Sequence, residues 1–134
     1  MTVGFSSSFL NSALGCLGNG ASGGTSFTAY AGNYGQIHTG DPGASGTANV
    51  SAGDNTRKAV GLAAASGGSR SLTGTNPVWT NGGTSETISH LSLHSASSAG
   101  TFAGSGALAA SKAWASTDTL PLTSLAVSVS PVAA

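Results

Sequence analysis

Turn-forming residues interrupt this chain at short intervals, and they limit the regular structure that it can form. From Ser22 onward, clusters of Gly, Asn, Asp, Pro and Ser separate runs of only a few apolar or β-branched residues. Short runs of this kind between turns are typical of antiparallel β-structure. Their spacing of roughly 8–12 residues predicts about seven to nine short strands, arranged as a sandwich or barrel.

The expected strands follow the apolar runs. They cover residues 34–39, 56–64, 71–75, 78–80, 87–95, 101–109, 112–115 and 125–129, with residues 27–30 as a further strand or an extended arm. In the last strand, Leu125, Val127 and Val129 alternate with Ala and Ser. Alternation of this kind places the larger side chains on one face of a strand.

One segment has the periodicity of a helix. Ser6, Ser7 and Ser8 offer N-caps, because a serine hydroxyl accepts a hydrogen bond from a free backbone N–H of the first turn. The apolar residues that then share one helical stripe are Phe9, Leu10, Ala13, Leu14 and Leu17. The stripe predicts a short helix, which the glycines of residues 18–20 end.

These patterns predict an all-β chain with one short N-terminal helix. We expect residues 1–24 to form an arm with the helix and a Gly-rich connector. Residues 25–134 are expected to form a single antiparallel β-sandwich or jelly-roll-like domain. The length suits one such domain with its own core. We expect Trp79 and Trp114 to anchor this core, with a place at an interface as the alternative.

Charge is scarce: the 134 residues include four Lys or Arg and four Asp or Glu, while 39% are hydrophobic. A globular domain usually carries about a quarter of charged residues, which keep its surface soluble. The shortage therefore favours a protein whose surface lies against other proteins in an assembly. The basic residues Arg57, Lys58, Arg70 and Lys112 are expected to pair with the few acids within the chain or across a subunit boundary.

The same composition argues against several classes of partner. The net charge is zero and the basic residues are scattered, so nucleic acid binding is not expected. No apolar run approaches the roughly 20 residues of a membrane helix, and the first residues lack the basic region of a secretory signal. We therefore expect neither a membrane partner nor a secreted protein.

No pattern of catalytic, metal-binding or cofactor-binding residues stands out. His90 and His94 are four apart, which on a strand separates them by about 13 Å, too far for one metal ion; only His38 remains to join them. We expect histidines at an interface or rim, with mild pH sensitivity. The G-x-G-x-x-G of residues 18–23 follows a helix, whereas a dinucleotide site follows a strand. Neither a nucleophile elbow nor a close carboxylate pair is present.

Two acidic residues are expected to structure turns. Asp41, Pro42 and Gly43 follow the expected strand of residues 34–39. An aspartate side chain in this position accepts a hydrogen bond from the backbone two residues on, so Asp41 is expected to cap the turn before Gly43. We expect the same role for Asp118.

The order of motifs is the remaining source of information. After the helix come residues 23–28, 37–46, 57–60, 88–93, 99–102, 104–108 and 118–120. In this order the chain resembles a family of small tailed-bacteriophage virion proteins, often labelled phage tail-fibre-like or minor structural proteins. The resemblance covers nearly the whole chain. Gly40 departs from it, because the family usually has alanine there.

The resemblance implies a non-enzymatic structural protein of a phage virion, assembled in the bacterial cytoplasm. We expect a capsid decoration or cement protein, because one compact domain has neither a stalk nor a receptor-binding head. The alternative is a minor tail or tail-fibre protein, and a carbohydrate-binding module is more remote. The expected partners are the major capsid protein or tail proteins and further copies of the chain.

The N-terminal segment is the expected docking or subunit-exchange element, because its apolar stripe is easily presented to a neighbour. The residues concerned are Phe5, Phe9, Leu10, Leu14 and Leu17.

Overall fold

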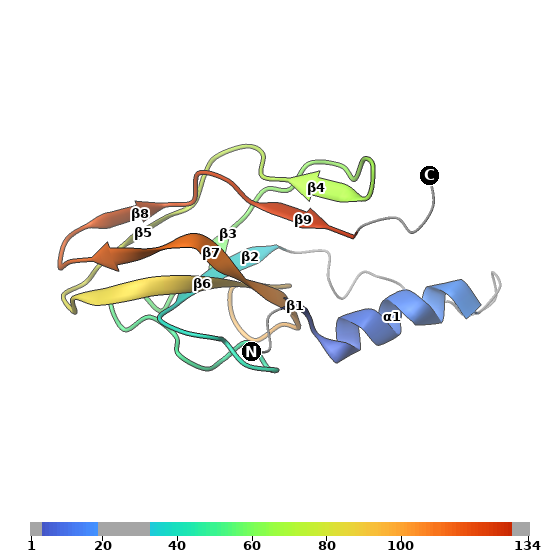
Figure 1. Cartoon of the computed structure of the whole chain (residues 1–134), viewed down its shortest axis with the longest axis horizontal. Coiled ribbons are helices and arrows are strands. Elements are labelled where there is room, and N and C mark those ends of the chain that lie inside the picture. The colour runs from blue at the N-terminus through green and yellow to red at the C-terminus, as the bar shows by residue number, and fades with distance from the viewer. Residues whose placement is uncertain (1–3, 19–32, 130–134) are drawn as a thin grey trace.

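The computed structural model has two layers of strands and a single helix that extends beyond them (Figure 1). It describes residues 4–18 and 33–129, except for the side chains of residues 15–18. The expected strand or arm of residues 27–30 lies outside these ranges. The expected domain boundary after residue 24 also lies outside them and stays a prediction.

The helix and the strands are short, apart from one long hairpin. They are β1 (Gly4–Phe5), α1 (Ser7–Gly18), β2 (Tyr34–His38), β3 (Lys58–Ala59), β4 (Ser69–Ser71), β5 (Val78–Thr80), β6 (Glu86–His94), β7 (Phe102–Trp114), β8 (Thr119–Pro121) and β9 (Ala126–Ser128). Every strand pair of the described residues is antiparallel. The predicted all-β class with one short helix is thus confirmed, while the description as a β-sandwich or jelly roll stays a prediction.

The first layer is a five-stranded sheet in the order β1-β7-β6-β2-β3. Its β7 is one strand of 13 residues, where the sequence predicted two strands separated at residues 110–111. That prediction of two strands is wrong because residues 110–111 contain no Gly, Pro, Asn or Asp, and β6 pairs with β7 on both sides of them. The interruption appears instead as an irregularity in the pairing of β6 with β7, between the pairs Ile88–Lys112 and His90–Ala107.

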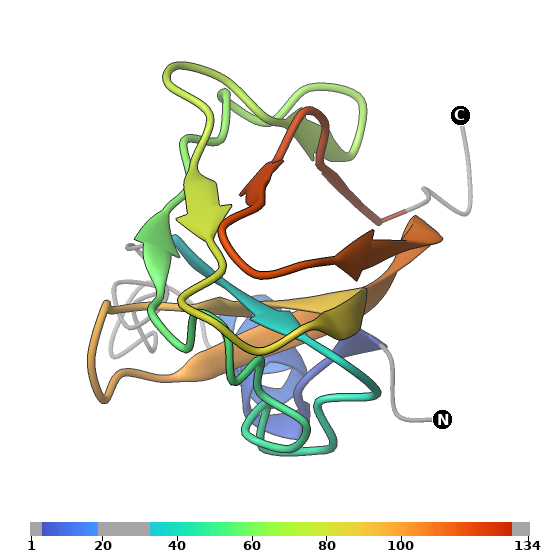
Figure 2. The same cartoon turned by 90° about the vertical axis from the view of Figure 1, so that its left-hand side faces the viewer.

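The second layer is a two-stranded ribbon in two parts. One part pairs β4 with β9 and the other pairs β5 with β8. Hydrogen bonds from Leu72 N to Leu125 O (2.8 Å) and from Leu122 N to Pro77 O (3.0 Å) join the parts. In Figure 2 the yellow-green and red strands of this ribbon lie above the cyan and yellow strands of the first layer.

The predicted strand of residues 56–64 is divided between the layers. Its β3 portion pairs with β2 in the first layer, whereas Leu62 forms a bridge with Leu72 in the second. The chain crosses between them at Gly61, where a Cβ would collide with the carbonyl oxygen of Thr73. Glycine is therefore needed at the crossing, and an uninterrupted strand cannot form there.

The core fills one end of the space between the layers. It consists of Ile37, Trp79, Ile88, Leu91 and Trp114. Each tryptophan Nε1–H donates to a backbone carbonyl, from Trp79 to Thr56 and from Trp114 to Asp118, both at 3.0 Å. Both tryptophans are therefore buried core residues with satisfied ring nitrogens.

Candidate protein-docking surface

The N-terminal arm is fixed to the edge of the first layer. After β1, Ser6 N donates to Ala103 O (2.9 Å) and Ser6 Oγ donates to Phe102 O (2.7 Å). The same Ser6 Oγ accepts from Phe9 N at 3.2 Å, which is the hydrogen bond of a helix N-cap. Of the three candidate serines, Ser6 thus starts α1 and ties that start to β7.

The structure divides the expected docking residues into two groups. Phe5 and Phe9 stack with their ring centroids 4.6 Å apart and are half-buried against the strands. Leu10 and Leu14 are 46% and 64% exposed. The side chain of Leu17 lies outside the described residues. Phe5 and Phe9 therefore hold the arm in place, and Leu10 and Leu14 face the surroundings.

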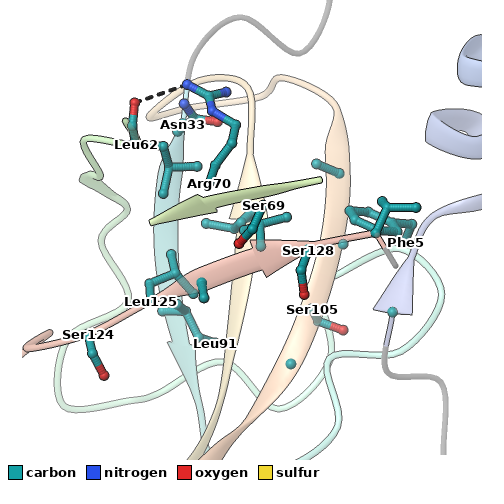
Figure 3. A pocket seen from close by; sticks show the side chains of 18 of the residues that line it. Phe5, Asn33, Leu62, Ser69, Arg70, Leu91, Ser105, Ser124, Leu125 and Ser128 are labelled. Atoms are coloured by element: carbon teal, nitrogen blue, oxygen red, sulfur yellow. Dashed lines mark hydrogen bonds between the residues drawn. The ribbon is translucent and has the colours of Figure 1, made fainter. Parts of the chain in front are cut away.

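A groove opens between the two layers at the end next to α1. It encloses about 980 Å³ and is lined by apolar side chains of both layers, including Leu62, Leu91 and Leu125 (Figure 3). We call this space the inter-layer groove. Its one charged lining residue among the described residues is Arg70, which donates to Ala63 O (2.7 Å) and Leu62 O (3.0 Å).

Sequence reasoning missed this groove. Its lining residues come from segments far apart in the chain, so no local sequence pattern predicts the groove. The one available signal was the run of small residues 103–107, whose side chains are too small to fill the space between two layers.

The turn residues support a long loop, residues 39–57, which connects β2 to β3. Gly43 N donates to Asp41 Oδ1 at 2.9 Å, and Gly43 has a φ of 72°. Pro42 is buried and its carbonyl accepts from Ala48 N at 3.0 Å. At the other turn, Asp118 Oδ2 accepts from Ala115 N at 3.2 Å. Both aspartates hold backbone N–H groups of their own turns.

Replacing Asp41 by alanine is expected to lower the free energy of unfolding by about 1 kcal/mol, because the hydrogen bond to Gly43 is lost. Urea unfolding followed by circular dichroism measures this difference. The Asp41→Asn variant is the control, since its side-chain oxygen still accepts the bond. Equal stability of Asp41→Ala and the unmodified chain would contradict the role of this side chain.

Two of the three histidines lie beneath this loop. His38 Nδ1 is 2.8 Å from Ala48 O and therefore carries the hydrogen, because a carbonyl only accepts. His38 Nε2 then accepts from Ser92 Oγ (2.7 Å), and His94 Nε2 lies within hydrogen-bond distance of the same hydroxyl oxygen, at 3.0 Å. We call His38, Ser92 and His94 the histidine network. All three side chains are fully buried, so the expected interface or rim position is wrong for these two histidines.

The surroundings of the histidine network keep both rings neutral. Burial lowers the pKa of His94 to about 4, and the positive charge of Arg57 acts in the same direction. Burial also lowers the pKa of His38. Arg57 itself donates to Gln36 Oε1 (3.2 Å) and to Ala99 O in the β6–β7 turn. The network therefore holds the loop against the sheet, and the hydroxyl of Ser92 is closed to solvent.

Within residues 4–18 and 33–129, no three His, Cys, Asp or Glu side chains gather as metal ligands would. No helix in these ranges is long and apolar enough to span a membrane. One ion pair within them joins Lys58 and Asp54 at 3.4 Å. A pairing of basic residues across a subunit boundary stays a prediction.

Comparison with known proteins decides the family. A family model described as the podophage GP4 fiber I protein gp80 matches residues 10–130. The chain belongs to this family. The fiber I protein gp80 family is a phage fibre family, so the chain is a structural component of a phage virion, as the resemblance implied. The match covers the exposed leucines of α1 and the strands β2 to β9, and it leaves out β1. No curated protein matches the chain.

Proposed function

We propose that the chain is a subunit of a phage tail fibre, joined to neighbouring virion proteins through α1. The observation that carries this proposal is the match of residues 10–130 to a fibre family. The expectation of capsid decoration rests on the size of the domain alone. The family name favours the alternative, a tail-fibre protein.

The surface chemistry of α1 supports a docking role. Its 12 residues contain no charged side chain, so no ion has to leave water when the helix is covered. Burying a leucine side chain stabilises a contact by about 1.5–3 kcal/mol. Burial of the two exposed leucines would therefore stabilise a contact with a neighbouring protein. Repetition of this contact along a fibre adds avidity.

The location is tested by gold-labelled antibody against the chain on intact virions, viewed by electron microscopy. Label on the tail fibres would support the proposal. Label over the heads would overturn it in favour of capsid decoration.

Replacing both exposed leucines by glutamine is expected to reduce incorporation of the chain into virions by about 100-fold, because two buried contacts are lost. Glutamine keeps the helix propensity of leucine, so the double variant Leu10→Gln with Leu14→Gln is expected to stay folded. Quantitative immunoblots of purified virions measure incorporation.

The matched control for this variant is Val78→Gln, since Val78 is 44% exposed but lies on β5, away from α1. It is expected to be incorporated at the normal level. Full incorporation of the double leucine variant would rule out α1 as the docking element.

A further inference from the structure

We infer that the inter-layer groove of one copy of this chain binds helix α1 of a second copy. The inference deepens the proposed function by naming the partner of α1, and it rests on that function only for its place in the virion. Two apolar surfaces are open in the same chain: the exposed leucines of α1 and the groove between the layers.

The apolar residues of α1 have the spacing of a helix that binds in a groove. Leu10 and Leu14 are one turn apart and exposed, and the sequence continues the stripe with Leu17 at the next turn. Anchors at i, i+4 and i+7 are those by which amphipathic helices occupy hydrophobic grooves in partner proteins.

The groove has room that the described residues do not fill. Gly104 and Gly106 lie on β7 opposite Leu93 and Leu91 of β6. A Cβ at Gly104 would come within 2.6 Å of the carbonyl oxygen of Gly4, so pairing with β1 explains that glycine. A Cβ at Gly106 would meet no atom within 4 Å. No packing within the described residues therefore explains why Gly106 is small, whereas a helix seated over it would.

Charge and shape fit the same occupant. The uncharged α1 meets a groove whose one charged lining residue, Arg70, is already bound to two backbone carbonyls. The groove has a volume of about 980 Å³, so it has room for leucine side chains that enter it from one edge of a helix, while the helix backbone, in a cylinder about 10–12 Å wide with its side chains, stays outside the layers.

The helix of the same copy cannot fill the groove. The hydrogen bonds of Ser6 fix the start of α1 to β7, and the helix then runs away from the strands (Figure 1). Of the α1 side chains that the structure describes, Phe9 lines the groove, whereas Leu10 and Leu14 do not. An α1 helix that occupies the groove must therefore come from a second copy. A helix-to-groove contact is heterologous, so it closes into a ring or continues as a filament.

The test uses the purified full chain and two variants, with mass measured by light scattering after size exclusion. Leu14→Gln weakens the helix, and Gly106→Leu fills the groove. We expect the unmodified chain to form oligomers, and each variant to associate at least tenfold more weakly. An equal mixture of the two variants is expected to form a one-to-one dimer, because the intact α1 of Gly106→Leu enters the intact groove of Leu14→Gln.

Several results would overturn the inference: an unmodified chain that stays monomeric, variants that assemble normally, or a mixture that stays monomeric. Circular dichroism checks that each variant is folded. If Gly106→Leu does not fold, Gly106→Ala replaces it, since its methyl group has space, and it is expected to weaken association by a smaller factor. Fibre labelling in virions together with a monomeric purified chain would refute this inference alone and leave the proposed function intact.

Discussion

Replacing Trp79 by alanine is expected to lower the free energy of unfolding by about 3–5 kcal/mol, the usual effect of removing a large aromatic side chain from a core. Trp79 is 1% exposed and lies in the core cluster with Ile37, Ile88 and Leu91. Its loss would leave a cavity between the layers. It would also remove the hydrogen bond that its ring donates to Thr56 O.

Urea unfolding followed by far-ultraviolet circular dichroism measures this change. Val78→Ala is the matched control, because Val78 is the neighbouring residue on β5 and is largely exposed. Its effect is expected to stay within about 0.5 kcal/mol. The loss of stability in Trp79→Phe is expected to lie between those of Val78→Ala and Trp79→Ala, since phenylalanine keeps an aromatic ring in the core but lacks the N–H that bonds to Thr56 O. A loss below about 1 kcal/mol for Trp79→Ala would mean that the two layers do not share this core.

Acidification from pH 7 to pH 4 is expected to destabilise the chain by about 3 kcal/mol through His94. The pKa of His94 is lowered from 6.5 to about 4, first by burial and then by the charges of Arg57 and His38. The unfolded chain therefore takes up a proton below pH 6.5 that the folded chain takes up only near pH 4. The contribution of neutral His94 to the free energy of unfolding is fully present above pH 6.5. It is lost as the pH falls toward 4, by roughly 1.4 kcal/mol per pKa unit.

His38 acts in the same direction, because burial also lowers its pKa. The measurement is a series of urea unfolding curves between pH 7 and pH 4 for the unmodified chain and His94→Gln. Glutamine cannot take up a proton, so this variant is expected to lose much less stability over the range. His90→Gln is the control: it removes an imidazole from the same strand and leaves the hydrogen bonds of the histidine network in place, although it also removes a charge that lowers the pKa of His38. The same pH dependence in His94→Gln and the unmodified chain would refute the assignment to His94.

The docking element shows which features local sequence patterns can predict and which they cannot. The serines before the stripe predicted the helix N-cap, and Ser6 makes that bond. The stripe also contained the leucines that are exposed. The stripe did not predict that Phe9 is half-buried and Leu10 exposed, because both lie on one side of a helical wheel. Which of the two is buried depends on where β1 pairs with β7. That pairing is a contact between residues about a hundred positions apart.

The long strands show a similar limit. Alternating residues predicted β6 to within one residue at each end, because alternation is a local property of a half-buried strand. The same pattern of alternation wrongly predicted two strands in place of β7. A bulge is decided by the pairing of two strands, so the sequence of one strand cannot distinguish it from a turn.

Local patterns in the sequence predict the all-β class, a helix near the N-terminus and the family, because turn chemistry, caps and alternation act between near neighbours. Two further features follow only from the packing of distant segments: His38 and His94 meet at Ser92, and a groove stays open beside Gly106. Both depend on the register between strands, and a slip of one residue would turn these side chains to the opposite face.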